Sequence, residues 1–102
     1  MKLLTIGVLS LSSALILSSS AMAGDAAAGK AKAQSCVSCH GMGGRSTNPN
    51  NPNLAGQKKN YLVKALNAYK KGERKDAMMN SLAAGLSDAD IENIAEYYST
   101  VK

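Results

Sequence analysis

The sequence predicts an all-α protein. Two stretches in its second half, residues 57–71 and 87–101, repeat apolar side chains at the spacing of an amphipathic helix. A third stretch, residues 26–35, consists largely of alanine, the residue with the highest helix propensity. No segment alternates apolar and polar residues as a half-buried strand does, and no internal repeat is present. We therefore expect one small helical domain.

The helix predicted over residues 26–35 begins after Asp25, whose carboxylate can accept hydrogen bonds from the first backbone N–H groups. Its residues are small, and they include Gly29 and Ala33. A helix with so little side-chain volume allows another element to approach its backbone closely. We expect such an approach here.

The helix predicted over residues 57–71 places apolar side chains on one face and lysines on the other. The apolar residues are Tyr61, Leu62, Ala65, Leu66 and Tyr69, and the lysines are Lys58, Lys59, Lys64, Lys70 and Lys71. Gly72 is a natural stop. Ser87-x-x-Asp90 resembles a capping box and opens the last helix, which runs to about Val101. Its apolar stripe is Ile91, Ile94, Ala95 and Tyr98.

Two stretches between these helices are expected to be irregular. Residues 41–56 contain several glycines and the run Asn48-Pro49-Asn50-Asn51-Pro52-Asn53, which holds both prolines of the chain. Residues 73–86 form the second stretch, which carries Met78 and Met79.

The first 23 residues have the layout of a cleavable secretory signal. Lys2 supplies a charge, residues 3–17 are mostly apolar, and Ala21-Met22-Ala23 precedes Gly24. A transmembrane anchor needs about 20 predominantly apolar residues, and this run is shorter and diluted by serine. We expect residues 1–23 to be a signal peptide and residues 24–102 to be the mature domain, located in the periplasm.

The pentapeptide Cys36-Val37-Ser38-Cys39-His40 has the C-x-x-C-H pattern of c-type haem attachment. Two thiols one helical turn apart can each form a thioether with a haem vinyl group, and His40 can then ligate the iron. The chain has no other cysteine or histidine. A zinc site would want four ligands, and a dithiol redox pair normally lies near a βαβ pattern. The motif therefore predicts one covalent haem c, whose attachment in bacteria takes place outside the cytoplasm.

The sixth coordination position of the iron decides the function. A methionine thioether there suits electron transfer, whereas an open position would permit chemistry on small molecules. Met42 lies two residues after His40, a reach of at most about 7 Å, which is too short to approach the opposite haem face. Met78 and Met79 are far enough along the chain, and both remain candidates at this point.

The run from Cys36 to Tyr98 resembles the class I c-type cytochromes, most closely the small soluble bacterial branch of cytochrome c-553-like proteins. The matching pieces are Cys36-x-x-Cys39-His40-Gly41, Pro52-Asn53-Leu54-Ala55-Gly56-Gln57, Tyr61-Leu62, Arg74 followed by Met79, and Leu86-Ser87-Asp88-x-Asp90-Ile91 leading to Ile94-Ala95-x-Tyr97. The resemblance implies the small cytochrome c fold, with three to four helices wrapped around the haem. It also implies that the first and last helices cross, with Gly29 and Ala33 facing Ile94, Tyr97 and Tyr98.

The resemblance also implies roles for single residues. The carbonyl of Pro52 would accept a hydrogen bond from His40 and so orient it toward the iron. Met79, seven residues before Leu86, matches the family's ligand methionine, and Met78 is the alternative. Tyr61 would hold a haem propionate or line the haem. Methionine opposite histidine should raise the reduction potential.

The function implied is that of a periplasmic monohaem electron carrier, without catalytic residues of its own. Its partners would be a membrane quinol-oxidising cytochrome complex as donor and a terminal oxidase or reductase as acceptor. After signal cleavage we expect a monomer that is not embedded in the membrane. Two alternatives are the haem c subunit of a periplasmic dehydrogenase complex and a haem protein with an open sixth position.

The chain has a net charge of +5, and much of its positive charge falls in residues 58–75. Such a run is either a solvated helix face or a docking patch for acidic redox partners. Nucleic acid is excluded as a partner, because the compartment is wrong and no aromatic residues interleave the basic ones as a stacking platform.

Overall fold

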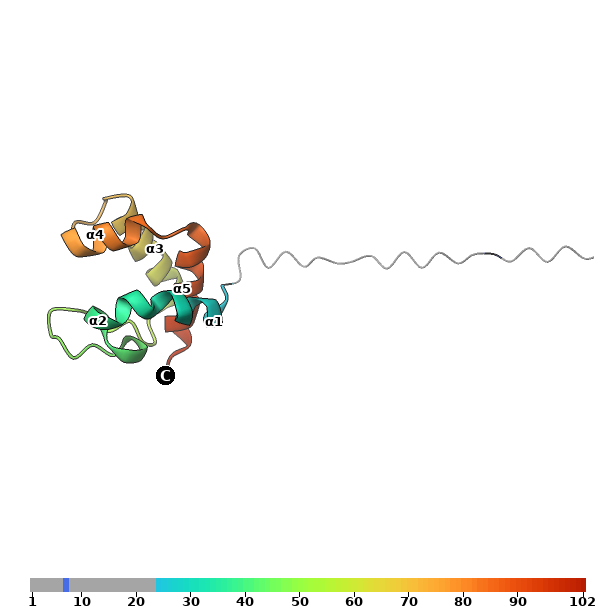
Figure 1. Cartoon of the computed structure of the whole chain (residues 1–102), viewed down its shortest axis with the longest axis horizontal. Helices are drawn as coiled ribbons and strands as arrows, with labels where there is room; N and C mark the ends of the chain where they lie inside the picture. The colour runs from blue at the N-terminus through green and yellow to red at the C-terminus, as the bar shows by residue number, and fades with distance from the viewer. Residues whose placement is uncertain (1–6, 8–23) are drawn as a thin grey trace, which may run out of the picture.

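The computed structural model describes Gly7 and residues 24–102, and within these residues it contains helices and loops but no strand. The elements are α1 (Ala26–Lys32), η1 (Ala33–Cys36), α2 (Val37–His40), η2 (Met42–Gly44), α3 (Lys59–Lys70), α4 (Ala77–Ala84) and α5 (Asp88–Thr100), of which Figure 1 labels the α-helices. The all-α prediction is confirmed. Apart from Gly7, the predicted signal peptide lies outside the described residues.

The first helix begins as predicted. The Asp25 carboxylate accepts hydrogen bonds from the backbone N–H groups of Ala27 and Ala28, at 2.9 and 3.1 Å. From α1 the chain continues through η1 and α2 without a loop, so the helical path runs past the predicted end at Ser35 and reaches His40. The haem-attachment pentapeptide therefore lies at the end of a helical segment that begins with α1 at Ala26.

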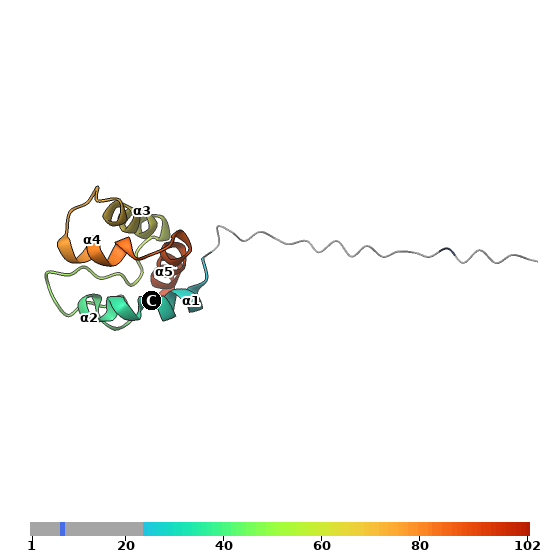
Figure 2. The ribbon, with the colours of Figure 1, turned by 45° about the horizontal axis from the view of Figure 1, so that its top comes forward.

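The first and last helices, α1 and α5, lie side by side in two views of the ribbon (Figures 1 and 2). Gly29 is buried at their crossing, where a Cβ atom would lie only 1.9 Å from the backbone oxygen of Asn93. The side chain of Asn93 in turn accepts a hydrogen bond from the backbone N–H of Asp25 at 2.8 Å. The predicted crossing through small residues is confirmed, because only glycine allows the two backbones to come this close.

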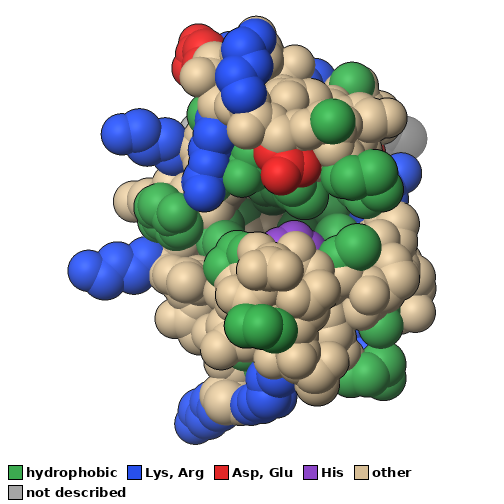
Figure 3. Space-filling model, turned by 90° about the vertical axis from the view of Figure 1, so that its left-hand side faces the viewer, with side chains coloured by type: hydrophobic (Ala, Val, Ile, Leu, Met, Phe, Trp, Pro, Cys, Tyr) green, Lys and Arg blue, Asp and Glu red, His purple; other side chains and the backbone are tan. Residues whose placement is uncertain are grey.

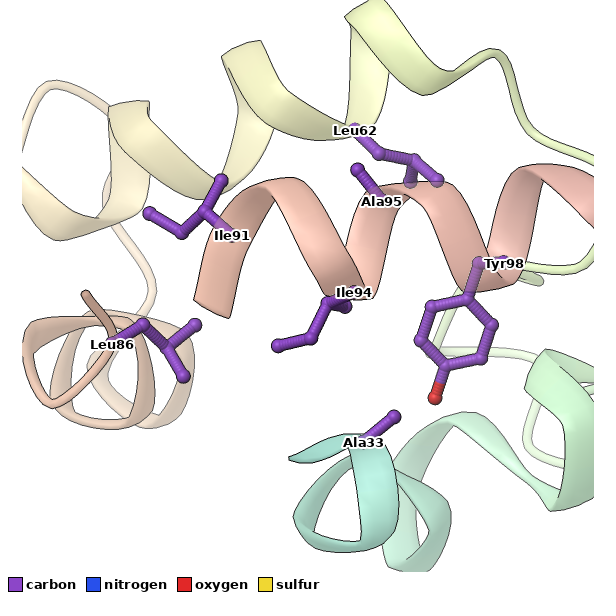
Figure 4. Close-up of a cluster of buried hydrophobic side chains, with 7 residues drawn as sticks. All are labelled: Ala33, Leu62, Leu86, Ile91, Ile94, Ala95 and Tyr98. Carbon is purple, nitrogen blue, oxygen red and sulfur yellow. The ribbon is translucent and has the colours of Figure 1, made fainter. Parts of the chain in front are cut away.

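The hydrophobic core forms around α5. Figure 4 shows four α5 side chains meeting residues from α3, from η1 and from the turn after α4. The cluster comprises Ala33, Leu62, Leu86, Ile91, Ile94, Ala95 and Tyr98. The members from α5 are Ile91, Ile94, Ala95 and Tyr98, which are the residues of the predicted apolar stripe. The core is small, which is expected of a domain of this length.

The prediction that residues 73–86 are irregular is wrong, since α4 occupies the middle of this stretch. The Asp76 carboxylate accepts from the backbone N–H of Met79 at 3.0 Å, and the backbone N–H of Asp76 donates to the Asn80 side chain at 2.8 Å. The Asn80 amide also donates to the carbonyls of Tyr69 and Arg74, both at 2.8 Å. These bonds cap the helix and hold its start against the end of α3.

The remaining boundaries agree with the sequence to within two residues. Helix α3 begins at Lys59, and Gly72, with φ of +74°, follows its last turn. Helix α5 begins with the predicted capping box, in which Ser87 Oγ accepts from the Asp90 N–H and the Asp90 carboxylate accepts from the Ser87 N–H. Among the residues described, no helix has the length and apolar character needed to span a membrane.

We predict that Gly29→Ala destabilises the holoprotein by about 1–3 kcal/mol, because the added methyl group forces α1 and α5 apart. Chemical denaturation measures the free energy of unfolding. Gly85→Ala is the matched control, since φ at Gly85 is −84° and its added Cβ meets nothing closer than 3.7 Å. This control should be neutral or slightly stabilising. Equal effects of the two substitutions would contradict the close helix crossing.

We predict that Asp90→Ala lowers stability by about 1 kcal/mol at pH 7 through loss of the capping box. The Ser87 N–H hydrogen bond lowers the pKa of Asp90 in the folded protein. The contribution of this carboxylate is therefore complete above its unfolded pKa, about 3.9, and is lost as the pH falls through the lower folded pKa. Denaturation curves for wild type and variant should converge in strong acid. A difference in unfolding free energy that stays constant with pH would contradict this. Asp88→Ala, at an exposed neighbouring position, is the control.

Candidate functional site

The two cysteines of the pentapeptide are three residues apart on the helical segment formed by η1 and α2, and residues at this spacing share a helix face. The two are not joined to each other by a disulfide. Cys36 is half-buried against the core, and Cys39 is exposed. Burial raises the pKa of the Cys36 thiol, which also hydrogen-bonds the hydroxyl of Tyr98. Tyr98 is buried on α5, so the last helix contacts the motif directly.

His40 is the only buried polar or charged residue in the described part of the chain, with 7% of its surface exposed. Its Nδ1 lies 2.9 Å from the carbonyl oxygen of Pro52. A carbonyl can only accept a hydrogen bond, so Nδ1 carries the proton and Nε2 keeps its lone pair. Directly after His40 the backbone turns at Gly41, where φ is +82° and a Cβ would lie 1.9 Å from the Arg45 oxygen. The structure thus brings His40 and Pro52 together across the loop.

Nothing in the sequence pattern marks Asn51 as part of this site, yet its side-chain amide donates to the carbonyl of Cys39 at 2.9 Å. The two residues are twelve positions apart, and asparagine in a Pro-rich loop ordinarily indicates only a turn. Asn51 and Pro52 therefore hold two consecutive residues of the motif, Cys39 and His40.

The imidazole of His40 lies in a hollow that is lined mainly by hydrophobic side chains. Figure 3 shows this face of the molecule, with the chain's one histidine inside the hollow, hydrophobic side chains around much of it and an acidic side chain at its edge. The core borders the motif here, because Cys36, Leu54 and Leu66 are partly buried against it. A largely apolar hollow with a single metal-binding nitrogen inside it fits a porphyrin, whose faces are apolar and whose iron requires an axial ligand. The residues present fit a haem.

The three methionines of the described residues differ in exposure. Met42, on η2, and Met78, on α4, are 78% and 71% exposed, whereas Met79 is half-buried. Adjacent residues of a helix point about 100° apart, so only one of the α4 pair can face the interior. That residue is Met79, which fits the role of ligand better than the other two.

Tyr61 lies on α3 and is half exposed. Its hydroxyl hydrogen-bonds the guanidinium of Arg74, and this bond raises the Arg74 pKa. The same guanidinium lies 4.7 Å from the centre of the Tyr69 ring, within the range of a cation–π contact. Tyr61 therefore belongs to a small cluster with Arg74 and Tyr69 that brings two phenol rings and one guanidinium together.

Comparison with known proteins identifies the family of the chain. The family model described as cytochrome c matches residues 26–102. Cytochrome c-554(548) of Halomonas halodenitrificans is 51% identical over 81 residues, which cover 76% of this chain and 98% of that protein. The thiosulfate dehydrogenase electron acceptor of Stutzerimonas stutzeri is 39% identical over 69 residues, covering 65% of this chain and 32% of the relative.

The fold also matches a solved structure. Reduced recombinant cytochrome c4 from Pseudomonas stutzeri superposes with a TM-score of 0.75 at 44% sequence identity, over 78% of this chain and 47% of that one. This chain thus spans nearly all of one relative and about half of another. The superposition supports the helical fold described above. The chain belongs to the cytochrome c family, and it is an electron carrier with one covalent haem c rather than an enzyme.

Proposed function

We propose that this chain carries single electrons in the periplasm on a haem c whose iron is ligated by His40 and Met79. The observation that carries the proposal is the hydrogen bond from His40 Nδ1 to the Pro52 carbonyl. It leaves Nε2 as the free nitrogen inside a largely apolar hollow. The haem, when bound, supplies reversible one-electron exchange between ferrous and ferric iron.

Each residue of the site then has one task. Cys36 and Cys39 hold the cofactor through thioethers, and His40 supplies the nitrogen ligand. Pro52 fixes the tautomer of His40 and increases the basicity of its ligating nitrogen. Met79 supplies the sulfur ligand, which closes the sixth position and raises the reduction potential. Tyr61, with Arg74, is suited to hold a propionate, since this pair presents a hydroxyl beside a guanidinium.

We propose further that residues 1–23 are cleaved on export and that residues 24–102 form the mature cytochrome c domain. The charge, the apolar run and the Ala-Met-Ala sequence before Gly24 support cleavage. The match of the family model from residue 26 to residue 102 supports the domain boundary. The periplasm is the compartment in which such an exported haem protein would act.

The positive charge of residues 58–75 is proposed to attract acidic redox partners to a monomeric carrier. Two of the lysines have internal partners: Lys59 bridges Glu92 and Glu96 at 3.5 and 3.3 Å, and Lys70 donates to the Leu86 carbonyl at 2.5 Å. The other basic residues of this stretch are exposed, namely Lys58, Lys64, Lys71, Arg74 and Lys75. Exposed charge of one sign accelerates encounter with a partner of the opposite sign. A quinol-oxidising complex as donor and a terminal oxidase or reductase as acceptor are the proposed partners.

A second candidate is the haem c electron-transfer subunit of a periplasmic dehydrogenase complex. The similarity to an electron acceptor of thiosulfate dehydrogenase favours it. The two candidates share the same haem site and differ only in the donor. Purification from native cells separates them, because a subunit co-purifies with a larger catalytic chain and a free carrier does not.

We predict that Met79→Ala removes the near-infrared charge-transfer absorption of thioether-bound ferric haem and lowers the reduction potential. The reason is that the iron loses its sulfur ligand. Met78→Ala is the matched control, because this neighbouring side chain is largely exposed, and it should leave both properties unchanged. Visible and near-infrared spectra of both oxidation states measure the outcome. If Met78→Ala loses this absorption and Met79→Ala keeps it, the ligand is Met78 and not Met79.

A further inference from the structure

The polar loop from Ser46 to Asn53 holds the end of the haem-attachment helix at two adjacent points. The side-chain amide of Asn51 donates to the Cys39 carbonyl, and the next residue, Pro52, accepts from the His40 ring; both distances are 2.9 Å. The second contact is the one that orients the histidine. The first contact has no task in the function proposed above.

The carbonyl that Asn51 binds needs a partner from outside the helix. The last carbonyls of any helix lack intrahelical donors, and α2 is only one turn long. The Gly41 N–H satisfies the Val37 carbonyl at 2.9 Å, and there the backbone turns away. The Asn51 side-chain amide is the hydrogen-bond donor for the Cys39 carbonyl. Because the Cys39 carbonyl and the His40 nitrogen belong to one planar peptide unit, this bond fixes the plane from which the His40 side chain projects.

Asn51 is itself held in place by hydrogen bonds within the loop. Its backbone N–H donates to the Asn48 carbonyl at 3.0 Å. Across the base of the loop, the Ser46 N–H donates to the Asn53 side chain at 2.7 Å. Just beyond it, the Leu54 N–H donates to the Gly44 carbonyl at 2.8 Å. The amide of Asn51 therefore extends from a braced loop rather than from a free turn.

We propose that Asn51 is a positioning residue for the axial histidine. It fixes the Cys39–His40 peptide so that the ring N–H of His40 stays on the Pro52 carbonyl. This inference rests on the proposed function, because it takes His40 as an iron ligand. Without the Asn51 amide, the bond between His40 and Pro52 opens more often. The imidazole then becomes a weaker electron donor, which destabilises the ferric state and raises the reduction potential.

The test uses the ferrous holoprotein with ¹⁵N-labelled histidine, which gives one ring N–H signal because the chain has one histidine. The variant is Asn51→Leu, which removes the amide donor at similar volume without adding charge. We expect exchange of the His40 ring N–H with solvent to be about fivefold faster, the effect of losing one ordinary hydrogen bond. We also expect an upward shift in reduction potential.

Two controls separate positioning from general destabilisation. Asn50→Leu changes the neighbouring loop residue, whose side chain makes none of the hydrogen bonds described for this loop. Ser87→Ala removes a helix cap on α5, far from the loop in sequence. Both controls should leave ring exchange and potential at wild-type values. Should Asn51→Leu fail to fold, Asn51→Ala removes the same donor with a smaller change.

The outcomes are distinct. Unchanged exchange and potential in the Asn51 variant would overturn the positioning role, as would equal changes in Asn50→Leu. If the wild-type protein carries haem but His40 is not its ligand, the proposed function itself fails, and the ring N–H signal of the wild type shows this before any variant is made.

Discussion

One nitrogen of the His40 imidazole is occupied by the Pro52 carbonyl, 2.9 Å away, and the proposed haem site depends on the other nitrogen. A buried imidazole without that contact could take either tautomer and could rotate within its hollow. The carbonyl removes this freedom, since it accepts but cannot donate. The geometry of the site thereby leaves Nε2 as the nitrogen available to a metal, and the hydrophobic side chains around it suit a large apolar cofactor (Figure 3).

The contacts between helices hold the helical turn that carries His40 in place. The segment that carries Cys36, Cys39 and His40 continues directly from α1, and α1 is fixed to α5 by the close approach at Gly29. Tyr98, near the other end of α5, contacts Cys36 through its hydroxyl. The protein core is small and gathers around α5 alone (Figure 4). A covalently attached porphyrin would add the apolar volume that a domain of this size otherwise lacks.

The sequence predicts those features that depend on neighbouring residues. The Asp25 cap, the Ser87–Asp90 capping box and the apolar stripe of α5 are local patterns, and the structure contains each of them. It does not predict α4, whose start depends on Asn80 reaching back to the turn after α3. Nor does it indicate Asn51, because the family resemblance implies a partner across this loop for His40 but none for the Cys39 carbonyl. Contacts of this kind appear only when distant segments have been brought together.

We propose that haem is bonded to the chain at Cys36 and Cys39 after export. The decisive measurement is mass spectrometry of the intact protein, produced from the full-length sequence with haem-attachment machinery and then denatured. We expect a polypeptide that begins at Gly24 and keeps the mass of one haem under denaturing conditions, located by proteolysis to the peptide containing both cysteines. Loss of all haem mass on denaturation would exclude covalent attachment at this motif.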